Sequence, residues 1–287
     1  MTEAIRVENL TFYYEGEVKP ALKNINLSIN EGEYVIITGP SGSGKSTLCR
    51  TFNGLIPHFY KGKMEGEVYV KGLRVKEHSV RELSKIVGMV FQEPENQVLT
   101  LSVKDEIAFG LENLGYPPNV IEDRIEHVLD VMGIKHLKNK VIFELSGGEL
   151  QKVIVASILA MNPDILVFDE PTSNMDPKSA LDFLKYTVKI NKEYGKTVII
   201  VEHRLDYIIS YASKIVVLND GEIVAIGNPR KVLMEDILED IGISIPQIPL
   251  LFKKLKRLLP CCETPLTIEE ALSLLGRVIA EGSYRGT

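Results

Sequence analysis

A glycine-rich stretch restricts the fold of this chain more than any other feature of its sequence. Residues 39–46 read Gly-Pro-Ser-Gly-Ser-Gly-Lys-Ser and match the pattern G-x-x-x-x-G-K-[ST] at every fixed position. Residues 33–38 have the composition of a buried strand, and residues 46–55 carry apolar residues at helical spacing. A strand, a glycine turn and a helix start aim backbone N–H groups and the positive end of a helix dipole at one point. The stretch, called the phosphate loop below, therefore predicts a phosphate-binding site.

Two side chains of the phosphate loop suit different parts of a bound nucleotide. Lys45 supplies a flexible positive charge for the β- and γ-phosphates, and the Ser46 hydroxyl can ligate Mg²⁺. We expect the whole loop and the residue after it to contact the nucleotide. These residues are Gly39, Pro40, Ser41, Gly42, Ser43, Gly44, Lys45, Ser46 and Thr47.

Composition limits the class of protein and its partners. The chain has 287 residues, of which 45% are hydrophobic and 25% charged, as in ordinary globular proteins. A net charge of −6 argues against broad neutralisation of nucleic-acid phosphates, so we predict no nucleic-acid partner. Cys49 and the adjacent Cys261 and Cys262 form no disulfide framework, which favours a reducing compartment. We see no signal peptide and no apolar run near the roughly 18 residues that span a bilayer, so any membrane role would come through a partner.

The order of the expected elements predicts an α/β fold. Residues 5–14 and 21–29 favour N-terminal antiparallel strands. Later strands and helices alternate, which is typical of a mainly parallel sheet with helices on both faces. The expected later strands are 66–72, 86–91, 164–168, 197–201 and the hairpin 214–218/222–225, and the expected helices are 103–114, 121–132, 150–161, 177–193 and 204–211.

Residues 92–162 interrupt this alternation and indicate an inserted helical subdomain. Pro117 and Pro118 break the chain there, and Asn119 and Glu122 are placed as an N-cap box for the next helix. We accordingly divide the chain into a nucleotide-binding domain at residues 1–235 and a small C-terminal helical extension at residues 236–287.

Two adjacent carboxylates follow an apolar strand in the second half of the chain. Residues 165–168 read Ile-Leu-Val-Phe and lead into Asp169 and Glu170. Beside the phosphate loop, Asp169 can hold Mg²⁺ and Glu170 can polarise the water that attacks a γ-phosphate. Neighbouring residues on a strand point to opposite faces, so the two tasks need two side chains. The pair predicts nucleotide hydrolysis.

A second helix start suited to an anion occurs at residues 145–149, Leu-Ser-Gly-Gly-Glu, called the signature below. Ser146 is a good N-cap, and Gly147 and Gly148 let an anion approach exposed N–H groups closely. We assign Glu149 to the nucleotide site with them. Unless the chain folded back sharply, one subunit could hardly bring both anion sites onto one phosphate. The simpler arrangement is two subunits, head to tail, each closing the nucleotide site of the other.

These motifs, in this order, resemble those of the ATP-binding cassette (ABC) ATPases over roughly residues 3–235. The resemblance implies ATP and Mg²⁺ as ligands. Tyr14 resembles the aromatic residue that stacks on adenine, with neighbouring Tyr13 as the alternative. Gln92 resembles the glutamine that contacts Mg²⁺ and the attacking water, and His203 resembles the histidine that contacts the γ-phosphate. The catalytic set implied is Lys45, Gln92, Glu170 and His203, and the metal set is Ser46, Gln92 and Asp169.

Four positions depart from the family pattern. Glu149 stands where the commoner signature ends in Gln, and no arginine stands at Ser157. The loop that crosses the dimer interface usually reads Ser-Ala-Leu-Asp, whereas residues 173–176 read Ser-Asn-Met-Asp. None of these changes removes a catalytic group. We therefore expect an active hydrolase and not a non-hydrolysing regulatory module.

Residues 91–98 and 102–110 resemble the ATPases of energy-coupling factor (ECF) importers, which take up vitamins or cobalt and nickel ions. This resemblance implies a peripheral protein at the cytoplasmic face of the cell membrane. Its partners would be a transmembrane scaffold subunit, a substrate-binding membrane subunit and a second ABC ATPase, identical or different. The alternatives are an ABC ATPase of another transporter type, or of a soluble macromolecular complex.

The C-terminal extension carries one further pattern. Residues 248–259 interleave four cations with apolar residues, which fits an amphipathic helix packed on the cassette or its dimer partner, or else a membrane-surface helix. Thr267 and Glu270 form a capping-box pattern before an apolar run. By resemblance to the importer ATPases, we expect the extension to support dimerisation.

Overall fold

The structure is a computed structural model that describes residues 2–173, 175–255 and 263–283. Its N-terminal part is a four-stranded antiparallel sheet in the order β2-β1-β4-β5. The long strand β1 pairs with β2 on one side and β4 on the other, and its alternate residues Leu10 and Phe12 are buried. These strands are β1 (Glu3–Tyr14), β2 (Leu22–Asn30), β4 (Gly62–Val70) and β5 (Leu73–Arg74). The predicted N-terminal antiparallel strands are thus confirmed.

A second sheet has six strands in the order β10-β9-β3-β8-β7-β6. The pairs β9–β3, β3–β8, β8–β7 and β7–β6 are parallel, and only the hairpin strand β10 is antiparallel. Its strands are β3 (Tyr34–Thr38), β6 (Val87–Val90), β7 (Ile165–Asp169), β8 (Thr197–Val201), β9 (Lys214–Asn219) and β10 (Glu222–Gly227). Since strands β3, β6, β7 and β8 are buried throughout, this is a sheet covered on both faces.

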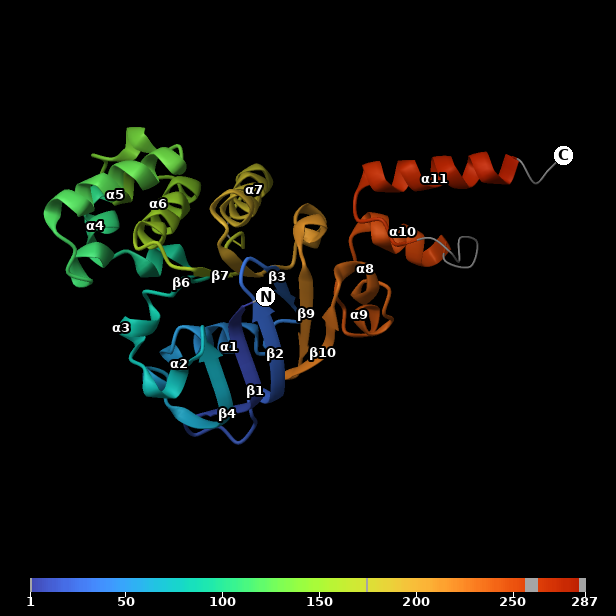
Figure 1. The fold of residues 1–287 in the computed structure, drawn as a ribbon, viewed down its shortest axis with the longest axis horizontal. Helices are drawn as coiled ribbons and strands as arrows, with labels where there is room; N and C mark the ends of the chain where they lie inside the picture. The colour runs from blue at the N-terminus through green and yellow to red at the C-terminus, as the bar shows by residue number, and fades with distance from the viewer. Residues whose placement is uncertain (1, 174, 256–262, 284–287) are drawn as a thin grey trace.

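Side chains of β3 alternate between two cores. Val35 and Ile37 pack with β1 and with helix α1 (Lys45–Phe52), whereas Tyr34 and Ile36 pack with the helices of the opposite face. Helix α7 (Pro177–Tyr194) lies on that opposite face, across the parallel sheet from α1 (Figure 1). Helices therefore cover both faces of the sheet, and the predicted fold class is confirmed.

The inserted helical part lies to one side of the sheets (Figure 1). It contains α4 (Val103–Asn113), α5 (Pro118–Val131) and α6 (Gly147–Ala160), which pack on one another through residues such as Ile107, Ile125 and Val153. Short helices α2 (Leu55–His58) and α3 (Val80–Leu83) lie on the chain that leads to it.

Two local predictions are wrong. Helix α5 has Pro117 as its N-cap and Pro118 at its first position, so Asn119 lies inside the helix and does not cap it. Proline suits that first position because it has no N–H group to satisfy. Residues 204–211 form two 3₁₀ turns, Leu205–Tyr207 and Ile209–Tyr211, and not one helix, because Ile208 leaves the helical region at φ −124°.

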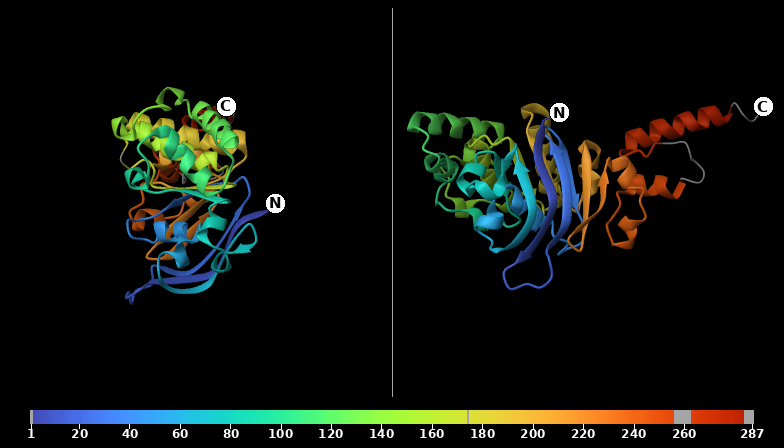
Figure 2. Two further views of the ribbon diagram at one scale, coloured as in Figure 1. Left: turned by 90° about the vertical axis from the view of Figure 1, so that its left-hand side faces the viewer. Right: turned by 60° about the horizontal axis from the view of Figure 1, so that its bottom comes forward.

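Helix α8 (Pro229–Val232) lies just before the C-terminal extension, which contains α9 (Ile237–Asp240), α10 (Gln247–Leu255) and α11 (Ile268–Ser283). Helix α11 points away from the sheets, on the side opposite the helical subdomain (Figure 2). Phe252 of α10 is buried, and Lys253 Nζ lies 3.0 Å from Glu239 Oε2 of α9. The rest of the predicted basic segment, residues 256–259, lies outside the described residues, as do Cys261 and Cys262. Among the described helices, none is both long and apolar enough to cross a lipid bilayer.

Candidate nucleotide-hydrolysis site

The phosphate loop joins the C-terminal end of β3 to α1. Gly39 has φ +149°, and a Cβ atom there would lie 2.1 Å from the Leu218 carbonyl oxygen, so the position has room only for glycine. Gly44, at φ +103°, is the N-cap of α1 and provides no side-chain cap for it. The first N–H groups of α1 are therefore left for another acceptor, as an anion site requires.

Lys45 is the buried cation of the loop. Its Nζ donates to the carbonyl oxygens of Gly39 and Pro40 at 3.0 and 2.9 Å and lies 3.7 Å from Glu170 Oε1. Burial lowers the pKa of the Lys45 amine, while the carboxylates of Glu170 and Asp169 oppose that shift. The amine is thus held over the loop with acceptors that a phosphate oxygen can replace.

Ser46 and Asp169 meet at the junction of α1 and β7. The Ser46 hydroxyl donates to Asp169 Oδ1 at 3.0 Å. Burial raises the pKa of Asp169, and the bond from Ser46 opposes this rise. The buried hydroxyl oxygen of Ser43, nearby in the loop, has no hydrogen-bond partner among the residues that the structure describes. Two adjacent oxygen donors and an unsatisfied loop hydroxyl fit a hard cation bound together with phosphate.

Glu170 lies between the other three predicted catalytic residues, Lys45, Gln92 and His203. Its Oε2 accepts from Gln92 Nε2 at 2.9 Å, and its Oε1 lies 3.2 Å from His203 Nε2. Its backbone, at φ +48°, is in the left-handed region, which directs the carboxylate out of the run of β7. Since β3, β6, β7 and β8 are parallel, the segments after their C-terminal ends bring Lys45, Gln92, Glu170 and His203 together.

Tyr14 is fixed beside the first helix. Its hydroxyl lies 3.1 Å from Thr47 Oγ1 and 3.3 Å from an Arg50 nitrogen, and its ring meets Phe12 and Tyr60 edge to face. Of the two candidate tyrosines, Tyr14 is therefore the one with a contact to a predicted nucleotide residue.

The signature forms the N-terminus of α6. Ser146 Oγ accepts from the Glu149 N–H at 3.4 Å, and Glu149 Oε2 accepts from the Ser146 N–H at 2.9 Å, which completes a capping box. The bond from the Ser146 N–H lowers the pKa of Glu149. Glu149 thus helps to cap the N-terminus of α6, a role that the sequence predicted for Ser146 only.

The signature lines a groove. None of the described residues that line this groove belongs to the phosphate loop. The groove is formed by Ser146, Gly148, Glu149, Lys152, Met175, Ser179, Asp182 and Phe183. Its walls come from the start of α6, from α7 and from Met175 before α7, and neither Lys45 nor Glu170 lines it. Within one chain, the predicted nucleotide residues therefore form two separate groups. Asn174 of the loop at 173–176 lies outside the described residues.

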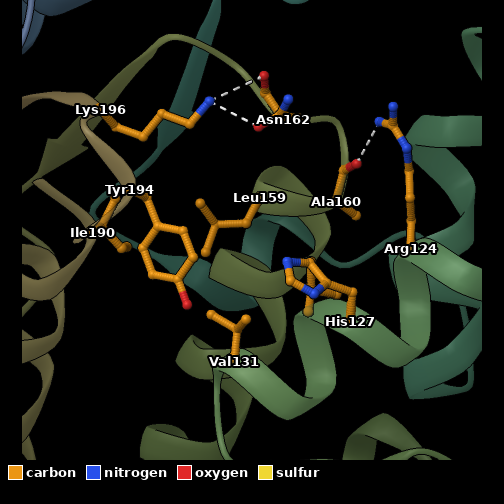
Figure 3. Close-up of a pocket in the computed structure, with 10 residues that line it drawn as sticks. Arg124, His127, Val131, Leu159, Ala160, Asn162, Ile190, Tyr194 and Lys196 are labelled. Atoms are coloured by element: carbon orange, nitrogen blue, oxygen red, sulfur yellow. Dashed lines mark hydrogen bonds between the residues drawn. The ribbon is translucent and has the colours of Figure 1, made fainter.

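A second pocket, of about 270 Å³, lies among α5, the end of α6 and α7 (Figure 3). Arg124 donates to the Ala160 carbonyl at 2.8 Å, and Lys196 donates to Asn162 Oδ1 at 2.7 Å. These cations pair with acceptors at the C-terminal end of α6, where positive charge is favourable. The pocket contains none of the predicted site residues, so we assign it to packing of the helical subdomain.

Sequence reasoning missed Glu202, a buried carboxylate directly before His203. Its side chain accepts from the N–H groups of His203 and Arg204 at 2.8 and 2.9 Å. An acidic residue at the end of an apolar strand, next to a candidate histidine, is the signal that could have revealed it.

A doubly covered parallel sheet, a glycine phosphate loop and a carboxylate pair at the strand ends define a P-loop nucleoside triphosphatase. Residues 22–173 match the ABC transporter family. An ABC transporter ATP-binding protein of Pyrococcus abyssi is 44% identical over 84% of this chain and 87% of its own length. The energy-coupling factor transporter ATP-binding protein EcfA2 of Caldanaerobacter subterraneus is 43% identical over 93% of this chain and 94% of its own.

Solved structures agree with these relatives. CbiO1 of Clostridium perfringens, part of the ABC transporter complex CbiONQ, has a TM-score of 0.74 at 33% identity, covering 88% of this chain and 100% of that one. A dimeric ATP-binding cassette in a post-hydrolysis state with ADP and Pi has a TM-score of 0.68 at 33% identity, covering 79% and 99%. Some relatives are longer, and the chain covers 50% of a Caldanaerobacter protein and 42% of one from Methanosarcina mazei.

The chain therefore belongs to the ABC transporter family of ATP-binding proteins, and its resemblance to the ECF-type ATPases is confirmed. It is an ATP hydrolase of that family.

Proposed function

We propose that this chain powers a multi-subunit ECF-type importer, in which ATP closes a pair of cassettes and hydrolysis opens it. The observation that carries the proposal is the separation of the two anion sites. Lys45 and Glu170 lie at one site, while Ser146 lines a different groove. A second cassette that presents its own signature to the phosphate loop would complete the site.

Each predicted residue then has a task that its position supports. Lys45 and the phosphate-loop N–H groups bind the β- and γ-phosphates, and Tyr14 stacks on adenine. Ser46, Gln92 and Asp169 would hold Mg²⁺, which would neutralise charge on the phosphates. Glu170 accepts a proton from the attacking water, and His203 contacts the γ-phosphate. Ser146, Gly147 and Gly148 of the second cassette bind that same γ-phosphate, which makes ATP a removable cross-link.

An exposed apolar surface near Gln92 supports a membrane partner. Leu99, Leu101 and Phe143 are 66, 69 and 78% exposed, and an isolated bridge between Ser102 and Val141 holds their two segments together. We call Leu99, Leu101 and Phe143 the docking patch. Large apolar side chains gathered on a surface mark an interaction site. Movement of Gln92 would be transmitted to a transmembrane scaffold subunit bound here through the short segment that joins Gln92 to the docking patch.

The remaining parts of the proposal follow from the ECF resemblance. The importer would take up a vitamin or a transition-metal ion, selected by a separate membrane subunit. The chain would be a peripheral protein of the cytoplasmic membrane face and would pair with itself or with a second ABC ATPase. Residues 236–287 would help to hold that pair.

Affinity purification of the full chain from detergent-solubilised membranes tests the proposal. We expect a hydrophobic scaffold protein and a second membrane subunit to co-purify. Phe143→Asp, in the docking patch, should lose them, whereas Val18→Asp, on the 93%-exposed Val18 far along the chain, should retain them. If the wild-type chain and both variants recovered soluble partners only, that result would contradict the importer role and favour a soluble macromolecular complex.

A further inference from the structure

The loop that carries His203 is held by a side chain. Strand β8 ends at Val201, and the Glu202 N–H still pairs with the Ile37 carbonyl of β3 at 3.2 Å. The next two N–H groups, of His203 and Arg204, both donate to Glu202 Oε1. The carboxylate therefore closes the turn in place of a backbone carbonyl.

The other oxygen of Glu202 reaches the segment that follows Glu170. The Thr172 hydroxyl donates to Glu202 Oε2 at 2.5 Å, and both residues are buried, with 1 and 4% of their surface exposed. The Thr172 carbonyl in turn accepts from the Met175 N–H at 3.1 Å, within the loop at 173–176. One carboxylate thus joins the turn after β8 to the turn after β7.

All three bonds are donated to Glu202, so its carboxylate acts only as an acceptor. Bonds to an ionised group are the strong ones, and a buried polar group that is fully satisfied fixes its surroundings in one arrangement. At the open end of this arrangement, His203 Nε2 lies 3.2 Å from Glu170 Oε1, although the His203 side chain is 49% exposed. The buried Glu202 carboxylate therefore holds the backbone turn that carries this exposed imidazole.

We infer that Glu202 is a positioning residue for ATP hydrolysis, which fixes His203 relative to Glu170 through the turn of its own loop and through Thr172. The inference rests on the proposed contact of His203 with the γ-phosphate. Glu202 touches neither nucleotide nor water in this scheme. It acts by holding the imidazole where the contact can form, and misplacement of such a group by about 1 Å can cost roughly 100-fold in rate.

The test is a double-mutant cycle on the full chain, with kcat and KM for ATP as readouts. Glu202→Ala should lower kcat about 10- to 100-fold and leave KM within about threefold, because the phosphate loop is untouched. His203→Ala should lower kcat at least as much, and the double variant should be no slower than His203→Ala alone. Glu202→Gln, which keeps one acceptor for the two N–H groups, should restore part of the loss.

Thr172→Val has a matched control in Thr187→Val. Thr187 is also fully buried and hydrogen-bonded, to Tyr34 and Leu184, but lies in α7. Only the Thr172 variant should lower kcat. The inference, but not the proposed function, would be overturned if the losses of kcat in Glu202→Ala and His203→Ala multiplied in the double variant. Wild-type kcat in both Glu202 variants would have the same consequence. Wild-type kcat in His203→Ala would instead contradict the proposed role of His203.

Discussion

Glu170→Gln separates the chemistry of ATP hydrolysis from the binding of ATP. The glutamine keeps the shape of the side chain and one acceptor for Gln92 or His203, which lie 2.9 and 3.2 Å away. It removes the group that would take a proton from water. Loss of a general base costs about 10²- to 10⁴-fold in rate, or about 2.7 to 5.4 kcal/mol in activation free energy.

Binding should respond in the opposite direction. Glu170 Oε1 lies 3.7 Å from Lys45 Nζ, and Coulomb's law gives two such charges an attraction of about 4 kcal/mol at an effective dielectric constant near 20. Desolvation offsets much of this attraction. Removing it still makes the lysine more available to a phosphate, so the affinity for ATP should be unchanged or higher.

The assay is steady-state phosphate release together with equilibrium ATP binding, both on the full chain with Mg²⁺. Glu33→Gln is a matched control. The Glu33 side chain is 17% exposed, against 18% for Glu170, and its carboxylate lies 2.9 Å from the Lys214 amine. Glu33 differs from Glu170 in its location, since it directly precedes β3. The control should hydrolyse ATP at the wild-type rate. Turnover of Glu170→Gln within a few-fold of wild type would refute the assignment of Glu170 as the base.

Three further predictions concern binding, capping and pH. Lys45→Ala should weaken MgATP binding about 10- to 100-fold in calorimetry, since a hydrogen bond to a charged group contributes about 1.5–3 kcal/mol; unchanged affinity would contradict its role. Ser146→Ala should lower the free energy of unfolding by about 1 kcal/mol and Asn119→Ala by less than about 0.5 kcal/mol, and equal losses in denaturant titrations would contradict the observed caps. Arg230 lowers the pKa of Glu270 from 4.5 to about 2, so this contact stabilises α11 against α8 above pH 4.5 and is lost as the pH falls toward 2. Hydrogen-exchange protection of α11 should fall over that range in the wild type but not in Glu270→Gln, and identical profiles would disprove the link.

The sequence predicted the parts of the fold whose chemistry is local. The phosphate loop needs glycine at Gly39, because a Cβ atom there would lie 2.1 Å from the Leu218 carbonyl oxygen. A local steric requirement of this kind appears in the sequence as a fixed position of a motif. Buried parallel strands read as apolar runs, and their common edge explains why Asp169 and His203 belong to one region of the molecule. The motifs, together with the family resemblance that supplied Gln92 and His203, therefore named four catalytic candidates that lie close together in the structure.

What the sequence could not predict depends on competing partners. Asn119 has the chemistry of a cap, but Pro118 fits the first helical position better, and the pattern alone did not rank them. Ile208 and Ile209 are both buried, and tertiary packing there favoured two 3₁₀ turns over the expected helix. Glu202 directly precedes His203, but its role depends on Thr172, which lies 30 residues away in the chain and which the sequence did not pair with it.

The central claim is that ATP is hydrolysed between two cassettes and not within one. The most direct measurement is the ATPase rate per chain across a range of chain concentrations, with the oligomeric state followed by sedimentation at each point. A purely monomeric chain should be inactive, and turnover should rise with the fraction of paired cassettes and fall when Ser146 is replaced. Full turnover by a monodisperse monomer, unaffected by replacing Ser146, would contradict the account.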